Sequence, residues 1–344
     1  MKKLFLVLSI CGLILSVVVC AGCQKTKPET SEVIIYTSVD QIYSEQILKE
    51  FEEETGIKVK PAYDVEAAKT TGLVQRLIAE KNRPRADVFW SGEVIQTIRL
   101  KEEGVLASYH SPEAVGIPET FLDPEGYWTG FAGRARIIIV NTDLVPRQEW
   151  PSSVFDLIDS SVPGNKIGIA MPMFGTTSTH AAALYSVLGD KEGKRFFEKI
   201  KTKGIAVLDG NSLVRDQVAQ GRLMFGLTDT DDACQAVQDG LPVQIIFPDQ
   251  EQDGLGTFVI PNTVAMIKGA PHPEQAKKLI DFLVSKEAEQ TMVEIGWSQF
   301  PVRPVTSKNT CLETGDIHEM EVDYGKVFLE LEKSAAEMRG IFVN

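Results

Sequence analysis

The sequence predicts an α/β protein built as two lobes, and three features support this fold class. Short apolar runs typical of buried strands alternate with longer segments whose apolar residues recur at helical spacing. No repeat of fixed period accompanies this alternation, so a repeat protein is not indicated. Two longer strand-like segments, 134–141 and 257–268, lie on either side of the middle third of the chain. Alternating strands and helices of this kind form mostly parallel sheets covered by helices.

The first third of the chain contains three expected strands and two expected helices. The strands are short apolar runs at residues 33–36, 57–60 and 86–90. Ser44 can cap a helix that Gly56 ends. The second helix is expected over 64–81, with apolar residues at core spacing at Leu73, Val74, Leu77 and Ile78.

The same alternation continues through the rest of the chain. Strands are expected at residues 136–140, 166–170, 205–208, 223–227 and 258–266. Helices are expected at residues 180–188, 190–204, 213–220 and 274–295.

The two long strand-like segments predict how the lobes are divided. If both segments cross between lobes, the first lobe consists of residues 32–133 plus 259–344, and residues 134–258 form the second. Two crossing strands make a hinge, and the cleft beside a hinge is where ligands prefer to bind. The prediction is therefore two α/β lobes with an interlobe cleft.

The N-terminus is typical of a bacterial secretory signal that ends in a lipobox. Lys2 and Lys3 precede an uncharged apolar run at 4–19, and small residues lead into Cys23. The signal peptide is expected to span residues 1–22, and Cys23 is expected to carry the lipid. A single transmembrane anchor is the alternative, but the apolar run is short for a span of about 20 residues. Residues 23–31 are polar and predict a linker that tethers the protein to the outer side of a membrane.

Composition argues against several classes of partner. The chain carries a formal net charge of −13 and has no basic stripe, which argues against nucleic acid. No stretch after the signal is apolar enough to span a bilayer. Beyond the signal and anchor only Cys234 and Cys311 remain, too few for a disulfide framework, and whether they pair stays open.

Enzyme signatures are absent from the sequence. There is no nucleophile elbow, no phosphate loop of the G-x-x-x-x-G-K-[ST] kind and no H-E-x-x-H motif. The cysteines lack metal-binding spacing. The four histidines are scattered along the chain at His110, His180, His272 and His318. The chain is therefore not expected to be an enzyme.

Polar loops follow four of the predicted strands, at residues 37–40, 91–93, 171–179 and 228–232. In an open α/β sheet the carboxyl ends of the strands border the ligand crevice. Each loop alone is compatible with a plain turn or helix cap, because Ser, Thr and Asp are common at such places. Four such loops at equivalent strand ends together predict a binding site.

Two of these loops offer opposite chemistry. The run from Gly175 to Thr179 puts hydroxyl groups and free backbone N–H groups at a helix N-terminus, which suits an anion. Arg134 and Arg136 can add a cation, although either can instead form a solvent-facing ion pair. Three aspartates, Asp229, Asp231 and Asp232, can hold a hard cation or a ligand ammonium. Alternatively, Asp231 and Asp232 are simply favourable in the first turn of a helix.

The chain resembles the extracellular solute-binding proteins of bacterial ABC importers, in the branch that binds ferric iron, phosphonates, polyamines and thiamine. The matching stretches span nearly all of the mature chain and are VIIYTSVDQIYSEQILKEFEEETGIKVK, ADVFWSGEV, GFAGRARIIIVNTDLVP, KIGIAMPMFGTTSTHAAAL, HPEQAKKLIDFLVSKEAEQ and GWSQFPVRP. The resemblance implies a type II periplasmic-binding-protein fold, a monomer, and an ABC permease with its ATPase as partners. It also implies that Asn211 belongs to the anion site.

The resemblance leaves two ligand classes open. Ferric binders of this branch typically carry adjacent tyrosines where this chain has aspartates at 229–232, although Tyr36 and Tyr63 remain in the first lobe. The ligand is expected to be Fe(III) with a synergistic anion, or a small zwitterion such as an aminophosphonate. A surface lipoprotein enzyme and a sensory receptor are the alternative functions. The expected ligand-binding residues are Thr37, Ser38, Asp40, Ser91, Glu93, Arg134, Thr176, Thr177, Asn211, Asp229 and Asp231, with Glu93, Asp229 and Asp231 as candidate metal ligands.

Overall fold

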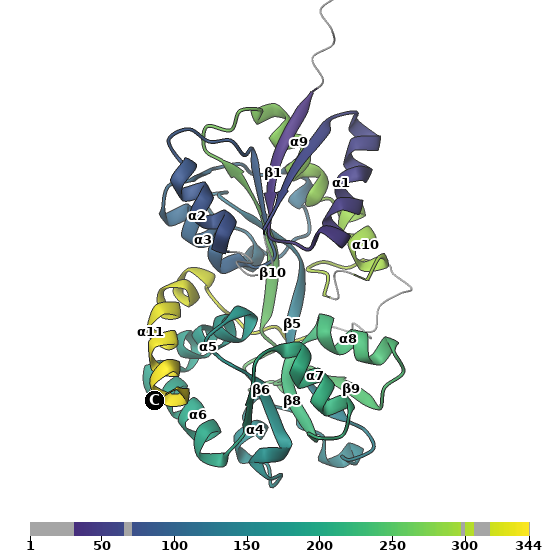
Figure 1. Cartoon of the computed structure of the whole chain (residues 1–344), viewed down its shortest axis with the longest axis vertical. Coiled ribbons are helices and arrows are strands. Elements are labelled where there is room, and N and C mark those ends of the chain that lie inside the picture. The colour runs from purple at the N-terminus through teal and green to yellow at the C-terminus, as the bar shows by residue number, and fades with distance from the viewer. Residues whose placement is uncertain (1–30, 65–70, 297–299, 306–316, 344) are drawn as a thin grey trace, which may run out of the picture. The chain divides into compact units, whose positions relative to one another are not determined.

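A computed structural model describes residues 31–64, 71–296, 300–305 and 317–343 (Figure 1). The predicted signal peptide, Cys23, the linker up to residue 30 and Cys311 lie outside the described residues. Residues Ser31–Asn344 form one compact unit. Among its described helices, none combines the length and apolar character needed to cross a membrane.

Ten described strands form one continuous sheet. They are β1 (Glu32–Thr37), β2 (Lys58–Tyr63), β3 (Val88–Ser91), β4 (Leu106–Ala107), β5 (Thr129–Asn141), β6 (Ile167–Ala170), β7 (Ala206–Leu208), β8 (Phe225–Asp229), β9 (Val243–Ile246) and β10 (Val259–Ile267). The main strand order is β2-β1-β3-β10-β5-β8-β6-β7, with β4 beside β10 and β9 beside β5.

The sheet consists of two halves that share β5. In the first half-sheet, β1 pairs in parallel with β2 and β3, and β10 runs antiparallel between β3 and the first part of β5. In the second half-sheet, the later part of β5 runs antiparallel to β8 and β9, and β6 pairs in parallel with β7 and β8. Figure 1 shows β5 and β10 lying between the two groups of strands.

Helices flank both half-sheets (Figure 1). They are α1 (Gln41–Thr55), α2 (Thr71–Glu80), α3 (Val94–Glu102), α4 (Asp156–Asp159), α5 (Gly175–Leu188), α6 (Asp190–Lys203), α7 (Asn211–Ala219), α8 (Thr230–Gln238), α9 (Pro273–Leu283), α10 (Lys286–Glu294) and α11 (Tyr324–Phe342). Helices α1 and α9 pack on the first half-sheet, and α7 and α8 pack on the second.

Several of the predicted helix boundaries are wrong, and α5, for example, begins at Gly175 rather than at His180. The first helix begins at Gln41 rather than after Ser44, whose hydroxyl instead donates to the carbonyl of Asp40 inside the first turn. The helix expected over 274–295 is two helices, because the hydroxyl of Ser285 accepts the Ala288 N–H and starts a new helix. Gly56 ends α1 as predicted, in the left-handed conformation that glycine adopts without steric cost (φ 70°).

The last helix, α11, packs mainly against a helix of the predicted second lobe, although the predicted division places it in the first lobe. That division places 259–344 in the first lobe, but α11 packs mainly against α5 and also contacts α6 and α3. The hydroxyl of Tyr185 on α5 donates to Glu337 at 2.8 Å, and Lys333 pairs with Asp190 at the start of α6. A helix with apolar residues on one face packs where a complementary surface exists, and strand topology alone does not specify that surface.

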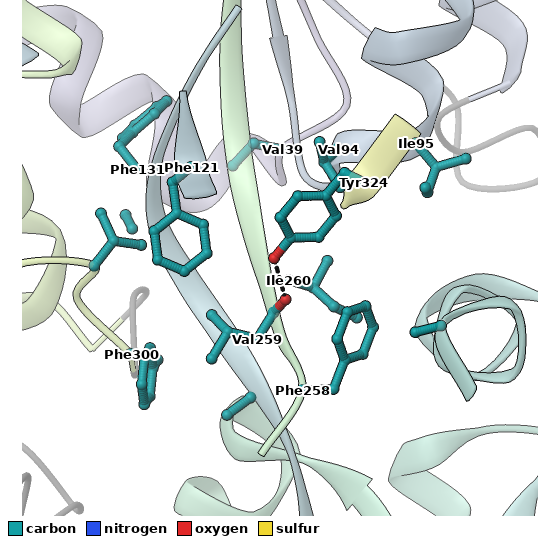
Figure 2. Close-up of a cluster of buried hydrophobic side chains, with 14 of the residues drawn as sticks. Val39, Val94, Ile95, Phe121, Phe131, Phe258, Val259, Ile260, Phe300 and Tyr324 are labelled. Atoms are coloured by element: carbon teal, nitrogen blue, oxygen red, sulfur yellow. Dashed lines mark hydrogen bonds between the residues drawn. The ribbon is translucent and has the colours of Figure 1, made fainter. Parts of the chain in front are cut away.

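Aromatic side chains fill the core where β5 and β10 run side by side (Figure 2). The ring of Tyr324 lies 6.3 Å from that of Phe258 and 6.4 Å from that of Phe121. Its hydroxyl donates to the carbonyl of Val259 at 2.6 Å, and burial raises the pKa of this hydroxyl well above its usual range. Tyr324 thereby connects α11 to the first residue of β10.

Replacing Tyr324 by Phe is expected to lower the free energy of unfolding by about 1–2 kcal/mol. The ring still fills its place, but the buried Val259 carbonyl loses its hydrogen-bond donor. Urea unfolding monitored by circular dichroism measures the difference. A variant as stable as the wild type would show that this hydrogen bond makes no net contribution.

Candidate functional site

A cavity of about 530 Å³ opens at the carboxyl ends of β1, β3 and β8. Residues from both half-sheets line it, because the loop after β1 and the loop after β3 meet the start of α5, α7 and α8 there. Helix α1 also begins at the cavity with Asp40, and Tyr43 follows one turn later. The polar loops singled out in the sequence therefore converge in one place.

Helix N-termini give the cavity a positive electrostatic component. In α1, α5, α7 and α8 the residue at the N-cap position makes no side-chain capping hydrogen bond. Uncapped first-turn N–H groups and the helix dipole favour an anion. Gly175 begins α5 with φ 55°, a backbone conformation that favours glycine, and brings the N–H groups of that turn to the cavity wall.

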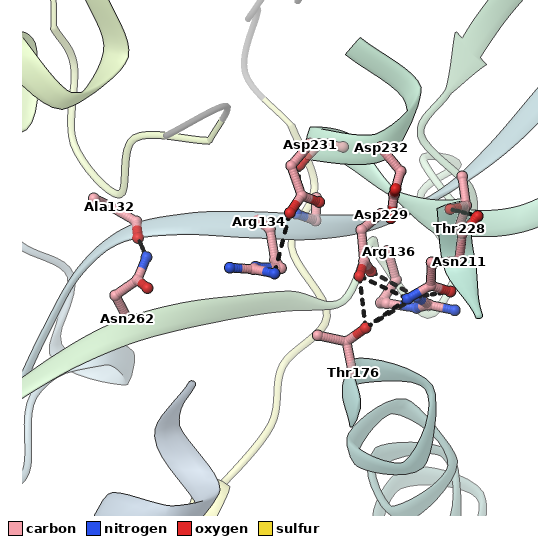
Figure 3. A network of polar contacts seen from close by, with 12 residues as sticks. Ala132, Arg134, Arg136, Thr176, Asn211, Thr228, Asp229, Asp231, Asp232 and Asn262 are labelled. Atoms are coloured by element: carbon pink, nitrogen blue, oxygen red, sulfur yellow. Dashed lines mark hydrogen bonds and ion pairs between the residues drawn. The ribbon is translucent and has the colours of Figure 1, made fainter. Parts of the chain in front are cut away.

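Asp229 is the centre of a buried polar network (Figure 3). Its Oδ1 accepts a hydrogen bond from Arg136 Nη1 at 2.5 Å, and Arg136 is fully buried. Its Oδ2 accepts hydrogen bonds from Thr176 Oγ1 at 2.6 Å and from Asn211 Nδ2 at 2.9 Å. Asp229 is thus neutralised by an ion pair and orients two side chains that line the cavity.

Asp231 and Asp232 face the cavity from the first turn of α8. Asp231 Oδ2 lies 3.1 Å from Arg134 Nη1, and Asp232 Oδ1 lies 3.6 Å from Arg215 Nη1. The Oδ1 atom of Asp231 is buried and has no hydrogen-bond partner among the described residues. Asp231 and Asp232 thus lie both in the first turn of α8, where they favour the helix, and on the cavity wall, where they can contact a ligand. The two interpretations offered by the sequence are therefore compatible.

The carboxyl groups of Asp231 and Asp232 bind protons more tightly than usual, since the pKa of each is raised. Burial raises the pKa of Asp231, although Arg134 opposes the shift. Burial and the neighbouring aspartates raise the pKa of Asp232 to about 7. One ligand atom each from Asp229, Asp231 and Asp232 lies within 4.8 Å of the others, a spacing that can hold a metal ion.

Glu93 lines the cavity but also serves as a helix cap. Its two carboxylate oxygens accept the N–H groups of Ile95 at 2.9 Å and Gln96 at 3.0 Å, at the start of α3. Burial raises the pKa of this carboxyl group, and the two backbone hydrogen bonds oppose the shift. As a metal ligand, Glu93 would have to share oxygens that already accept hydrogen bonds.

Most of the predicted site residues line the cavity: Ser38, Asp40, Glu93, Arg134, Thr176, Asn211, Asp229 and Asp231. Three others are buried behind the wall. Thr37 Oγ1 accepts the Val39 N–H at 3.0 Å, Ser91 Oγ accepts the Glu93 N–H at 3.4 Å, and Thr177 Oγ1 donates to Asn211 Oδ1 at 3.3 Å. These three residues shape the loops rather than face the cavity.

Several lining residues are absent from the set predicted from the sequence. They are Val39, Tyr43, Gly92, Gly175, Arg215, Asp232, Gln235, Gln238 and Gly296. Tyr43, Arg215, Gln235 and Gln238 lie three or more residues into helices that start at the cavity, so helical spacing counted from the loop residues would have found them.

Two further residues bear on the ligand question. Tyr36, one of the tyrosines noted in the sequence, is buried beside α2, where its hydroxyl donates to Glu80 at 3.0 Å, and it does not line the cavity. Tyr63 does not line it either. Cys234 on α8 is disulfide-bonded and so offers no thiol.

Comparisons with known proteins point to one family. A family model described as "Bacterial extracellular solute-binding protein" matches residues 46–310. The "Iron uptake protein A1" of Synechocystis sp. is 27% identical over 289 residues, which cover 80% of this chain and 77% of that protein. The "Putative 2-aminoethylphosphonate-binding periplasmic protein" of Salmonella typhimurium is 27% identical over 234 residues, which cover 67% and 66%.

The solved structure of a Trichodesmium protein, IdiA (FutA), in complex with iron and citrate is similar in fold. Its TM-score is 0.79 at 24% sequence identity, and the match covers 91% of this chain and all of that one. At this level of identity the likeness is evidence of the fold alone. It confirms the predicted fold class.

Proposed function

Because the chain belongs to the bacterial extracellular solute-binding proteins, a family of non-enzymatic transport components, we propose that it captures a small solute for an ABC importer. The solute would bind in the cavity at the carboxyl ends of β1, β3 and β8. The two half-sheets would act as the two lobes, and residues 134–258 would supply most of the second. Solute contacting both half-sheets at once would stabilise the closed arrangement.

The observation that carries this proposal is the mixture of charges around the cavity. Its wall presents two guanidinium groups, Arg134 and Arg215, and five carboxyl groups, namely Asp40, Glu93, Asp229, Asp231 and Asp232. Uncapped helix N-termini add partial positive charge. A ligand that carries both an ammonium and an anionic group matches this arrangement.

We therefore propose a small zwitterion such as an aminophosphonate as the first ligand candidate. Its anionic group would lie at the start of α5, beside Thr176 and Asn211. Its ammonium would lie beside Asp231 and Asp232, where Asp231 Oδ1 lacks a partner among the described residues. A Salmonella relative carries the name of an aminophosphonate binder, which supports this choice.

Fe(III) with a synergistic anion is the second candidate. The close spacing of Asp229, Asp231 and Asp232 supports it, as does a relative named for iron uptake. Fe(III) prefers hard anionic oxygen ligands, and Tyr43 is a phenol on the cavity wall. Asp229 is already paired with Arg136, so Asp231, Asp232 and Tyr43 are the stronger candidates for direct ligands.

Titration of the purified chain lacking residues 1–23 tests both candidates. Isothermal titration calorimetry with 2-aminoethylphosphonate and with ferric citrate is the direct measurement, and native mass spectrometry with absorption spectra identifies what co-purifies. A visible charge-transfer band with bound iron would support the second candidate. Binding of neither probe would reject both candidates and leave the family assignment intact.

We also propose that Cys23 carries a lipid and holds the chain on the outer side of a membrane. Cys23 lies outside the described residues, and the proposal depends on the lipobox-like sequence before it. The permease and ATPase of an importer are the proposed partners. A sensory role presented to a membrane kinase is the alternative, and neighbouring genes for a permease and an ATPase would favour transport.

Replacing Cys23 by Ser is expected to abolish incorporation of an alkyne-labelled fatty acid in a bacterial host. Cys23 is the cysteine that ends the lipobox-like sequence, so its thiol is the group expected to receive the lipid. Click labelling of the immunoprecipitated protein measures incorporation, and the Cys11→Ser variant is the control, expected to label normally. A Cys23→Ser protein that is still labelled, or a wild type that never is, would contradict the anchor.

A further inference from the structure

One residue of β5 departs from the regular pairing with β10. Pro261 pairs with Gly133, but the next residue, Asn262, pairs with Phe131. Ala132 is therefore the extra residue of a β-bulge. Its φ is 38°, a left-handed conformation that residues with a Cβ rarely adopt, and Asp249 is the other described non-glycine residue with positive φ.

Two buried side chains hold the peptide groups of Ala132 from opposite sides. Glu289 Oε1 accepts the Ala132 N–H at 2.9 Å. Asn262 Nδ2 donates to the Ala132 carbonyl, as Figure 3 shows. Glu289 is fully buried and Asn262 is 2% exposed. Both polar groups that the bulge removes from the strand ladder are thus satisfied by side chains.

Glu289 is itself fixed by the surrounding structure. It accepts the Val302 N–H at 2.9 Å and forms a buried ion pair with Arg303 at 2.9 Å. Arg303 donates in turn to the carbonyls of Glu113 and Val115 at 3.1 and 3.0 Å. The bulge is therefore anchored to α10 and to the segment around 113–115, which lies outside the second half-sheet.

The strand beyond the bulge leads directly to the candidate site. Arg134, two residues after Ala132, pairs with Asp231, and Arg136 pairs with Asp229. Both aspartates belong to the end of β8 and the start of α8 in the second half-sheet. A rotation of the backbone at Ala132 would move these arginines and their partners relative to Ser38 and Glu93.

We propose that Ala132 is the pivot between the two half-sheets, and that Asn262 and Glu289 are positioning residues for solute capture. This inference rests on the proposed function, in which the half-sheets close on the solute. These two side chains form hydrogen bonds with the N–H and the carbonyl of Ala132. They thereby fix the backbone conformation of Ala132, which sets the direction in which β5 enters the second half-sheet. Neither side chain lines the cavity, so they act alike on every solute.

The test compares Asn262→Ala and Glu289→Gln with a matched control. Glu289→Gln keeps an oxygen that can accept the Ala132 N–H, whereas Glu289→Ala would remove that acceptor and leave the buried Arg303 with backbone carbonyls alone. The control is Thr97→Val, which removes a buried 2.6 Å hydrogen bond to Thr263, the residue after Asn262 in β10. That bond joins α3 to β10 and does not touch the bulge.

The first measurement needs no solute. Spin labels on cysteines introduced at Arg85 and Arg195, whose side chains are 72% and 62% exposed, report the distance between the half-sheets by double electron–electron resonance. Asn262→Ala is expected to broaden or shift this distance distribution, Glu289→Gln to change it less, and Thr97→Val to leave it as in the wild type. A folded Asn262→Ala protein with the wild-type distribution would overturn the proposal.

The second measurement is the Kd for 2-aminoethylphosphonate and for ferric citrate. A pivot residue acts on closure, so Asn262→Ala is expected to change the Kd of each probe that binds by the same factor, about 3–10-fold. A change confined to one of two binding probes would indicate direct contact and overturn the proposal. If the wild type binds neither probe, the ligand candidates fail, and the spin-label distances still decide whether Ala132 is the pivot.

Discussion

Replacing Asp229 by Ala is expected to lower the free energy of unfolding by about 3–5 kcal/mol and to abolish solute binding. The substitution leaves the Arg136 guanidinium fully buried without its counter-ion, and an uncompensated buried charge carries a cost of this size. Thr176 and Asn211 lose the carboxylate that orients them. Urea unfolding followed by circular dichroism measures the stability, and calorimetric titration measures binding.

A double variant separates the two effects. In Arg136→Met with Asp229→Leu no lone charge remains, so most of the lost stability is expected to return while binding does not. Asp253→Ala, an exposed loop substitution, is the control and is expected to match the wild type in both measurements. An Asp229→Ala protein within about 1 kcal/mol of the wild type would contradict the buried-charge argument, since breaking such a pair costs several times that amount.

Replacing both Asp231 and Asp232 by Asn is expected to weaken binding of 2-aminoethylphosphonate by about 10–100-fold with little loss of stability. Hydrogen bonds to charged groups contribute about 1.5–3 kcal/mol, and 1.4 kcal/mol is tenfold in Kd. The ligand ammonium is expected to lose the equivalent of one such bond, because each Asn keeps a neutral oxygen that can accept a hydrogen bond. Both side chains reach the cavity from the first turn of α8, and Asn fits the same places at that turn. Unchanged affinity would remove this pair from the ligand site.

The affinity for an ammonium ligand is also expected to rise between pH 6 and pH 8. Burial raises the pKa of Asp232 to about 7, so this group becomes an anion only in the upper part of that range. The ligand's own ionisation also contributes to the pH dependence. The part of the pH dependence that comes from Asp232 is expected to be absent in the Asp232→Asn variant, so comparing the variant with the wild type measures that part. An identical pH profile in the variant would contradict the assignment.

The ionisation of Asp232 is expected to change folding stability in the opposite direction from affinity, so that stability falls as the pH rises. The folded chain binds this proton more tightly than the unfolded chain, whose carboxyl has a pKa near 3.8. Stability contributed by Asp232 is therefore full below about pH 4 and is lost as the pH rises towards 7. Asp232→Asn is expected to flatten that part of the stability profile.

Much of the fold could be predicted because strand and helix periodicity is local. The strands at 33–36, 166–170 and 205–208 are found where apolar runs indicate them. The course of α11 could not be predicted, because its packing on α5 depends on surfaces far apart in the sequence. The break between α9 and α10 is not evident from the sequence, because the apolar pattern continues through Ser285, which caps the new helix.

The site was found from loops at strand ends, which is where α/β topology brings polar residues together. The loop sequences do not indicate which side chains of each loop face the cavity. The sequence therefore also predicts Thr37, Ser91 and Thr177 as site residues, and these three are buried behind the cavity wall. The sequence predicts a cation at Arg136, but the role of Arg136 as partner of Asp229 follows from the register of β5 on β8. Strand register is a long-range property.

The disulfide at Cys234 has a consequence for how the protein must be handled. Helix α8 carries four lining residues, Asp231, Asp232, Gln235 and Gln238, and Cys234 lies among them. Disulfides form and persist in oxidising compartments such as the cell envelope and are rare in the reducing cytosol. Protein produced in the cytosol, or kept with a reducing agent, would lack this cross-link in the helix that presents its carboxylates, so binding should be measured on oxidised material.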